Sequence, residues 1–245
     1  MRYALILSYK GTAYHGWQRQ DNAISVQQVL EEKLSIFSRE PAEITGCGRT
    51  DTGVHASYYV AHVDLQNPLG TDAAHRLNGM LPADIAISRV VEVPDSFHAR
   101  FDATAREYAY HIHFSKNPFK TDSSWQRPNQ YDFEVMNQAA QLLLGIHSFE
   151  CFCKGPAPAD NFRCEIFKAE WQVQDDSAVF VIRANRFLRN MVRAIVGTLL
   201  DVGTLKMSIS EFQQLIETGS RSDAGNSVPA HGLFLTDISY PETFK

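Results

Sequence analysis

The stretch FLRNMVRAIVGTLLDV at residues 187–202 is the most informative element of this 245-residue chain. Its apolar side chains recur with the spacing of one helix face: Leu188, Met191, Val192, Ile195 and Leu199. Another face carries polar and charged side chains at i, i+3, i+4 and i+7: Arg186, Arg189, Asn190 and Arg193. The pattern predicts a helix that seals a core with one face and presents guanidinium groups on the other.

Other segments of the chain predict further strands and helices. Residues 164–174 and 178–184 read as a pair of strands joined by a turn at Asp175-Asp176. Capping boxes, in which a Ser is followed three residues later by Glu or Gln, predict two more helices: 26–39 after Ser25, and 209–218 after Ser208.

Strands and helices are intermixed along the whole chain. Each half has about two predicted helices over several predicted strands, some of them in hairpins. This arrangement predicts an α+β fold of two similar layered domains, with helices packed on one face of each sheet. We place the domains at residues 1–104 and 105–245.

The composition is that of a globular protein, with 44% hydrophobic and 21% charged residues. No apolar run reaches the roughly 18 residues that a membrane span requires. The start of the chain has a short apolar stretch and no small-residue cleavage site, so it predicts a first strand rather than a signal peptide. Four cysteines in a chain of this length do not make a disulfide scaffold. We therefore expect a cytoplasmic protein with free thiols.

The charge is unevenly distributed. A net charge of −5 is unusual for a protein that binds nucleic acid. The segment 177–200, however, contains no acidic residue and carries four arginines: Arg183, Arg186, Arg189 and Arg193. A solvated face normally mixes charges of both signs, and clustered guanidinium groups suit phosphates. The segment favours a phosphate-binding strip, and an ordinary solvated face is the alternative.

GRTDTGVHA at residues 48–56 contains the Asp-Thr-Gly triplet of aspartic proteases. Such a protease needs two carboxylates that share a proton, and this chain has one such triplet. Arg49 lies two residues before Asp51 and would hold the carboxylate ionised, which is the opposite of a shared proton. The protease interpretation is therefore disfavoured. A structural role in a turn stays open, because Asp and Gly are common turn residues.

The same stretch closely resembles the GRTDAGVHA motif of the TruA-type tRNA pseudouridine synthases. The resemblance continues in the same order along nearly the whole chain: YKGTAYHGWQRQ (9–20), FHARFDATAREYAYHI (97–112), GIHSFECF (145–152), ANRFLRNMVRAIVGTLLDVG (184–203) and VPAHGLFLTDISY (228–240). Three places depart from the family pattern. Thr52 stands where Ala is usual, Ser148 stands where Asp is usual, and Asn185-Arg186 stands where the residues are often small or include Gly.

The resemblance implies roles for individual residues. Asp51 would be the catalytic carboxylate, and it leaves open attack on the base, attack on the ribose or abstraction of a ribose proton. Arg193 would pair with Asp51, although a phosphate contact or a plain surface charge is the alternative. Tyr108 would be a further catalytic residue that stacks on the target uracil and could handle a proton, or else be a core aromatic residue of its strand.

The resemblance also implies a set of substrate-binding residues. Arg49 would help to displace the target base, and Leu233 would pack on the other side of that base or be a buried strand residue. His55 would orient the loop or lie in the core. The remaining candidates are the phosphate-binding arginines Arg183, Arg186 and Arg189.

The implied reaction converts uridine to pseudouridine without redox change, so no cofactor and no metal is expected. The sequence has no Gly-rich phosphate loop, and Cys151-x-Cys153 and His111-x-His113 match no standard zinc module. The resemblance further implies the pseudouridine synthase fold with a cleft between its domains and a homodimer. Its substrate would be the tRNA anticodon stem-loop at nucleotides 38, 39 and 40. The rivals are a synthase of the same fold that acts on another RNA and a non-catalytic tRNA-binding module.

Overall fold

The computed structural model describes residues 1–128, 131–155 and 161–242. Contacts divide the chain into two units, one formed by Met1–Thr104 with the segment that begins at Phe234, and one formed by Ala105–Leu233. The chain first passes from one unit to the other between Thr104 and Ala105. The C-terminal strand β10 (Leu233–Ser239), which we expected in the second domain, pairs with β3 (His55–Asp64) in the first unit.

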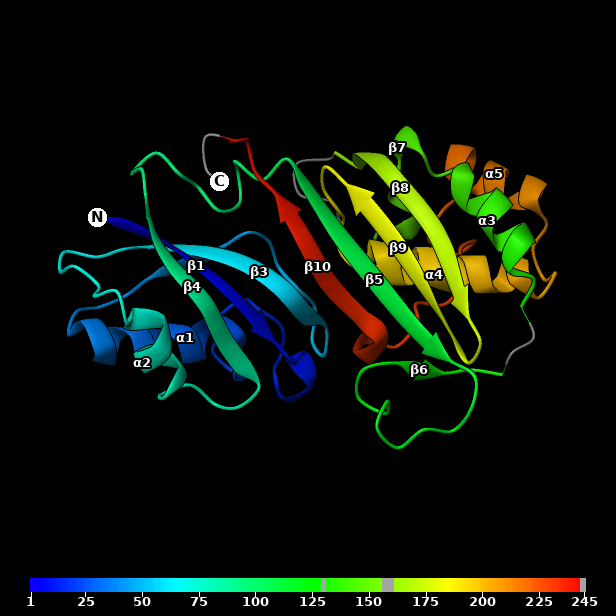
Figure 1. Ribbon diagram of the computed structural model, residues 1–245. Coiled ribbons are helices and arrows are strands. Elements are labelled where there is room, and N and C mark those ends of the chain that lie inside the picture. Colours follow the sequence, from blue (N-terminus) through cyan, green and yellow to red (C-terminus); the bar gives the residue numbers. More distant parts are fainter. Residues whose placement is uncertain (129–130, 156–160, 243–245) are drawn as a thin grey trace. The chain divides into compact units, whose positions relative to one another are not determined.

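The first unit is built on a mixed sheet (Figure 1). Its other strands are β1 (Arg2–Tyr9), β2 (Ile44–Gly46) and β4 (Ile85–Val93). Strand β1 lies between β4 and β3 and is antiparallel to both, while β2 is antiparallel and β10 parallel to β3. Almost every residue of β1 is buried, as its run of apolar residues predicts.

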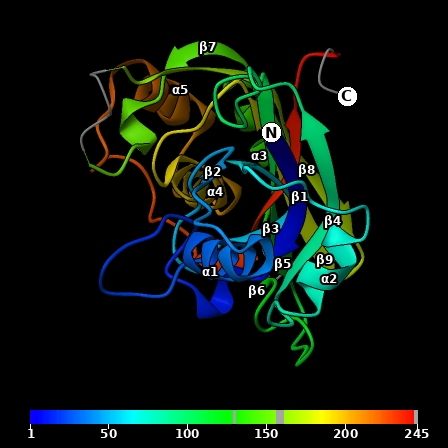
Figure 2. The ribbon, with the colours of Figure 1, turned by 90° about the vertical axis from the view of Figure 1, so that its left-hand side faces the viewer.

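Two α-helices accompany this sheet, α1 (Val26–Ser38) and α2 (Ala73–Asn78). Figures 1 and 2 show α1 lying along one face of the strands of its unit. The Ser25 hydroxyl accepts a hydrogen bond from the Gln28 amide at 3.2 Å, which is the predicted cap. The predicted capping box is only half formed: the Ser25 cap is present, but the Gln28 side chain does not accept from the Ser25 backbone amide, and its own amide donates to Glu32.

The second unit has its own set of strands: β5 (Ala105–His113), β6 (Trp125–Gln126), β7 (Gly145–Ser148), β8 (Arg163–Gln174) and β9 (Ser177–Ala184). The order β5-β9-β8-β7 is antiparallel throughout, and β6 pairs in parallel with β5. The strand pair predicted from the sequence is the hairpin β8–β9. The short strands β6 and β7 were not predicted, since so few residues show no periodicity.

The helices of the second unit are α3 (Phe133–Gln141), α4 (Met191–Gly203) and α5 (Ile209–Thr218). Figures 1 and 2 show them on one side of its strands. Helix α5 begins with the predicted capping box between Ser208 and Glu211. Helices packed on strands in both units confirm the α+β class. Within the described ranges, no helix combines the length and apolar character that a bilayer crossing requires.

Helix α4 corrects the most specific prediction from the sequence. It begins at Met191 and not at residue 187, because Asn190 adopts a left-handed conformation with φ 64°, which an α-helix cannot contain. All but two of its residues are buried. A helix that is apolar on nearly all sides is a core helix, so the predicted division into an apolar and a cationic face is wrong.

Candidate active site

Asp51 lies in the first unit, on the loop between β2 and β3, and its side chain is half-buried. The loop is held by backbone hydrogen bonds. The Trp17 amide donates to the Thr50 carbonyl at 3.2 Å, and the Val54 amide donates to the Asp51 carbonyl at 3.1 Å. Gly16, with φ 85°, makes this close approach possible, because a Cβ there would collide with the Thr50 carbonyl oxygen. The carboxylate is therefore carried on a fixed turn.

A buried group of aromatic side chains also holds this turn in place. The Thr50 hydroxyl is buried and lies 2.8 Å from the Tyr9 hydroxyl. Trp17 and Tyr59 stack with ring centroids 4.0 Å apart, and the Tyr59 hydroxyl donates to the Gly48 carbonyl. The hydroxyls of Tyr9 and Tyr59 are both bonded to the loop, while the rings are buried in the core. This packing positions the residues on both sides of Asp51.

His55 begins β3 and has an exposed fraction of 0%. Its Nδ1 accepts a hydrogen bond from the Gly11 amide at 3.0 Å, and its ring stacks on Phe234 with centroids 4.5 Å apart. Any effect of His55 on a substrate would therefore pass through the loops that it joins. Arg49, in contrast, is exposed on the Asp51 loop.

Tyr108 lies in the second unit, on β5, opposite Ile182 of β9. The ring is half-buried and meets Phe187 edge to face, with centroids 5.1 Å apart at 89°. Tyr110, two residues further along β5, is fully buried and donates its hydroxyl to the Pro229 carbonyl at 3.0 Å. Burial raises the pKa of Tyr110. Of these two neighbouring tyrosines, Tyr108 is the one whose ring reaches the surface.

Arg193 lies in the first turn of α4, and its side chain is fixed by a segment that follows α5. Its Nε donates to the Val228 carbonyl at 2.7 Å, and the Val228 amide donates back to the Arg193 carbonyl at 3.2 Å. We call residues 220–229 the strap. The strap lies directly on α4, because a Cβ at Gly197 would collide with the Asn226 carbonyl oxygen. The Gly225 amide also donates to the Thr198 hydroxyl at 2.9 Å.

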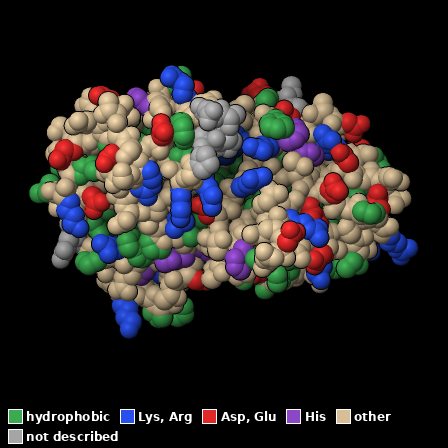
Figure 3. Space-filling view, turned by 180° about the vertical axis from the view of Figure 1, so that it is seen from behind, with side chains coloured by type: hydrophobic (Ala, Val, Ile, Leu, Met, Phe, Trp, Pro, Cys, Tyr) green, Lys and Arg blue, Asp and Glu red, His purple; other side chains and the backbone are tan. Residues whose placement is uncertain are grey.

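The other three arginines of the predicted strip do not share a helix face with Arg193. Arg183 lies on β9, opposite Glu107 of β5, and Arg186 and Arg189 lie in the connection before α4. The prediction overlooked Glu107 because an acid distant in the sequence becomes a neighbour across the sheet. Arg186 is half-buried and Arg189 is exposed. Lys and Arg side chains are among those visible on the face of the molecule that Figure 3 shows.

Leu233 is buried where β10 begins, at 5% exposure. Asp51, Arg49 and His55 thus belong to the first unit, and the other candidate residues belong to the second. The candidate residues are thus divided between the two units, as expected from sequence motifs that occur along nearly the whole chain.

Comparison with known proteins accounts for this spread of motifs. A family model described as tRNA pseudouridine synthase matches residues 5–102 and 139–241. The tRNA pseudouridine synthase A of Parabacteroides distasonis is 46% identical over 243 residues, which cover 98% of this chain and 96% of the relative. The protein of the same name from Bacteroides fragilis is 47% identical over 244 residues, covering 98% and 97%.

The chain belongs to the tRNA pseudouridine synthase family. Both matched ranges contain candidate residues, with Asp51 in the first and Arg193 in the second. Family membership over nearly the full length confirms the resemblance that the sequence motifs indicate.

Sequence analysis missed the residues that support the candidate site. Val228 and Gly197 hold the Arg193 side chain and the strap, but neither carries a reactive group. The sequence signal that could have found this contact is Gly197 itself. A Gly in the interior of an apolar helix usually marks a close approach of another backbone segment. The Tyr9, Trp17 and Tyr59 group has no such signal, since its members come from three separate segments.

The candidate metal ligands have other partners. His113 is buried, and its Nδ1 lies 2.9 Å from the Ser124 hydroxyl. Cys151 is buried, and burial raises its pKa to about 12, so the thiol stays protonated. Across the part of the chain that the structure describes, no group of three or more His, Cys, Asp or Glu residues could hold a metal ion.

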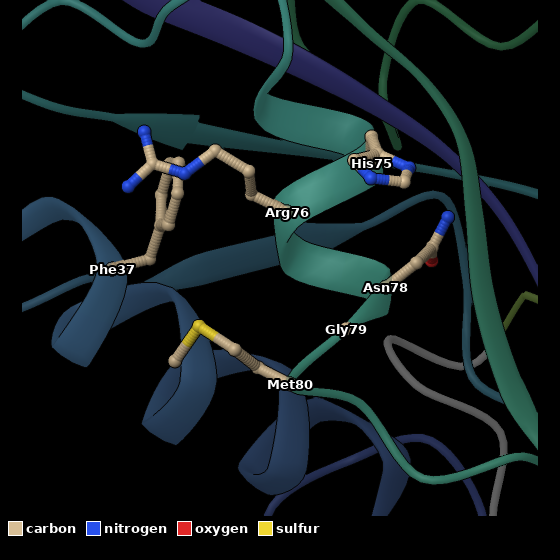
Figure 4. A pocket seen from close by; sticks show the side chains of 6 residues that line it. All are labelled: Phe37, His75, Arg76, Asn78, Gly79 and Met80. Atoms are coloured by element: carbon tan, nitrogen blue, oxygen red, sulfur yellow. The ribbon is translucent and has the colours of Figure 1, made fainter.

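A hollow of about 630 Å³ in the first unit lies apart from the candidate residues of that unit (Figure 4). It is lined by residues of α1 and α2 and the turn that follows: Phe37, His75, Arg76, Asn78, Gly79 and Met80. Two of its polar side chains already have partners. The Arg76 guanidinium lies over the Phe37 ring at 4.9 Å, and the Asn78 amide bonds both backbone groups of Ile87 at 2.8 Å. None of the candidate catalytic residues lines this hollow.

Proposed function

We propose that this chain is an isomerase that converts uridine to pseudouridine at nucleotides 38, 39 and 40 of the tRNA anticodon stem-loop. The observation that carries the proposal is the family match, with 46% to 47% identity to tRNA pseudouridine synthases A over 98% of the chain. The reaction breaks the N-glycosidic bond, turns the base and joins C5 to the ribose. C5 loses its proton and N1 gains one, so the composition of the nucleoside is unchanged and nothing is oxidised.

Asp51 is the proposed catalytic carboxylate. A catalytic carboxylate must be ionised and held at a constant distance from the reacting carbon. The hydrogen-bonded turn around Thr50 and the aromatic group beneath it supply such a fixed position. Arg193 is proposed to pair with Asp51, and its bond to the Val228 carbonyl restricts the directions in which the guanidinium points.

The remaining candidate residues are proposed to bind the RNA. Tyr108 stacks on the target uracil, and its ring is held edge-on by Phe187. Taking a base out of its stack costs a few kcal/mol, and stacking on an aromatic side chain offsets about 1–3 kcal/mol of this. Arg49 and Leu233 contact the displaced base, and His55 keeps the Asp51 loop in place. The phosphates are contacted by Arg183, Arg186 and Arg189.

The test is to map pseudouridine in unmodified tRNA after incubation with the purified protein, using carbodiimide labelling and primer extension. Asp51→Asn should fold and bind tRNA but form no product. The matched control is Asp95→Asn, an exposed carboxylate on another loop, which should keep full activity. Product from Asp51→Asn would exclude the proposed role of Asp51. Signal at other sites or only in another RNA would exclude the proposed substrate, and tight binding with no product from the native protein would indicate a binding module.

We also infer that the protein acts in the cytoplasm as a homodimer, as its family resemblance implies. Light scattering of the purified protein tests the second point. A mass of twice 27.6 kDa is expected, and a mass of 27.6 kDa at micromolar concentration would contradict it.

A further inference from the structure

The loop between β5 and β6 displays an aromatic side chain on the surface. Phe119 is 90% exposed, which is the largest exposed fraction among the large apolar side chains of the described residues. Isolated exposed apolar residues are common, and their exposure alone has no functional meaning. The meaning here depends on how the loop is built and on the charges beside the ring.

The sequence around Phe119 specifies a tight turn. In Asn117-Pro118-Phe119-Lys120 the Lys120 amide donates to the Asn117 carbonyl at 3.2 Å, so Pro occupies the second position of the turn and Phe the third. The Asn117 side chain accepts a hydrogen bond from the Phe119 amide at 2.9 Å. The amides of Ser123 and Ser124 then donate to the Lys120 carbonyl. The ring is thus presented by a folded turn.

The base of the loop is anchored to the sheet. The Phe114 amide donates to the Asp176 carbonyl at 3.1 Å, and the Ser115 amide donates to the Asp176 carboxylate at 3.0 Å. At the other end, the Ser124 hydroxyl lies 2.9 Å from the buried His113 ring. These bonds fix both ends of the loop, so the position of the turn relative to β5 is defined.

Cationic side chains accompany the exposed ring. Lys116 is exposed and Lys120 is half-buried on the turn, while Arg127 lies over the Trp125 ring at 4.5 Å just beyond it. Asp122 is the one acidic residue in the segment 114–128. A net positive loop is unusual on a chain with a net charge of −5. An exposed aromatic ring between lysines suits a nucleobase with a phosphate on each side.

We propose that the loop 114–124 is a second RNA contact, in which Phe119 stacks on an unpaired base of the tRNA and Lys116 and Lys120 hold the adjoining phosphates. The inference rests on the proposed function, because tRNA supplies the single-stranded segment. The loop contains none of the candidate catalytic residues, so it contributes to binding and leaves the chemical step unchanged.

The first test measures affinity of the full chain for unmodified tRNA. Phe119→Ala should weaken binding about 5- to 100-fold, and Phe119→Trp should keep it, since any base stacks on an aromatic ring. Lys116→Ala with Lys120→Ala should reduce the slope of log K against log salt by about 0.7 for each phosphate that is no longer neutralised. The control is Ile146→Ala, an exposed apolar residue on β7. Unchanged affinity in Phe119→Ala would overturn the proposal.

The second test places a photo-crosslinking phenylalanine analogue at position 119 and, as a control, at position 146. A crosslink to the tRNA from position 119 alone is expected. A crosslink to a second copy of the chain would overturn the proposal and make the loop a protein contact. Pseudouridine formed by the unmodified chain, without a crosslink or an affinity change, would overturn only this inference. A crosslink with weakened binding but no pseudouridine would overturn only the proposed activity, and no binding at all would overturn both.

Discussion

His62 is a buried histidine near the end of β3, 6% exposed, with no place in the proposed chemistry. Its Nδ1 accepts a hydrogen bond from the Ala99 amide at 3.1 Å, which requires the neutral ring. The rings of His98 and Phe97 lie edge-on to it. Burial, together with the charge of the nearby Arg2, lowers the pKa of His62 to about 4. Protonation would bury a charge and remove the bond to Ala99.

This lowered pKa predicts a loss of stability in acid. Between pH 6.5 and pH 4 the unfolded chain takes up a proton at His62 that the folded chain does not, so the free energy of unfolding should fall as the pH is lowered through this window. A shift of this size corresponds to roughly 3 kcal/mol. Above pH 6.5 His62 is neutral in both states and contributes no pH dependence.

Urea unfolding from pH 7 to pH 4 tests this expectation with His62→Asn, which keeps an acceptor for the Ala99 amide but does not titrate. The variant should be less stable at pH 7, because ring packing is lost, and it should lose less stability on acidification. The control is His75→Asn, a histidine of α2 that lies outside this cluster. Equal pH dependence in His62→Asn and the native chain would contradict the assignment.

At the scale of elements, the contact between α4 and the strap predicts the effect of one methyl group. Gly197→Ala would drive a Cβ into the Asn226 carbonyl oxygen, so the strap must move. Although Ala normally favours a helix over Gly, overpacking against backbone costs about 1–3 kcal/mol. Displacement of the strap also moves the Val228 carbonyl that orients Arg193. We expect lower stability and a lower kcat in pseudouridine formation.

The matched control for this prediction is Gly203→Ala at the end of the same helix. There the new Cβ would meet the Met136 thioether, and a flexible Met side chain can rotate away. Thermal unfolding and single-turnover rates should therefore change less than in Gly197→Ala. A Gly197→Ala variant with native kcat would show that the strap does not position Arg193.

The start of α4 shows where sequence patterns stop being informative. The apolar spacing correctly predicts a helix here, but Leu188 and Arg189 fit the same spacing without being helical. The helix begins only after Asn190. The side chain of this residue donates to the Ser227 hydroxyl of the strap, a partner distant in the sequence. Local periodicity cannot report such a tertiary contact. The capping box at Ser208, a purely local feature, was predicted correctly.

At the scale of the whole molecule, the charge distribution predicts how tRNA binding depends on salt. Replacing Arg183, Arg186 and Arg189 with Ala should weaken binding and reduce the slope of log K against log salt, because fewer counterions are released when fewer phosphates are neutralised. Arg183 should contribute least, since Glu107 lies opposite it across the strands. Lys206→Ala, an exposed lysine after α4, is the control. An unchanged slope in the triple variant would assign these arginines to an ordinary solvated surface.

The fold class and the family follow from the sequence because their signals are numerous and independent. Helix α5 has a local pattern strong enough to define both of its ends, at the predicted residues 209 and 218. The motif around Asp51 identifies the chemistry, but the support beneath it comes from Tyr9, Trp17 and Tyr59 together. Such support depends on side chains that meet only in the folded state. The chain of contacts from Gly197 to Arg193 is hidden for the same reason.

The place of β10 in the first unit has a consequence for folding during synthesis. Phe234 stacks on His55, the Ser57 hydroxyl donates to the Leu235 carbonyl, and the Thr104 amide donates to the Ser239 carbonyl. A ribosome makes residues 1–104 first, yet the strand that completes their sheet emerges only after residues 105–233. During translation the edge of β3 that pairs with β10 therefore stays unpaired until the end of the chain has been made. A nascent chain that is stalled before Phe234 would expose this edge to chaperones.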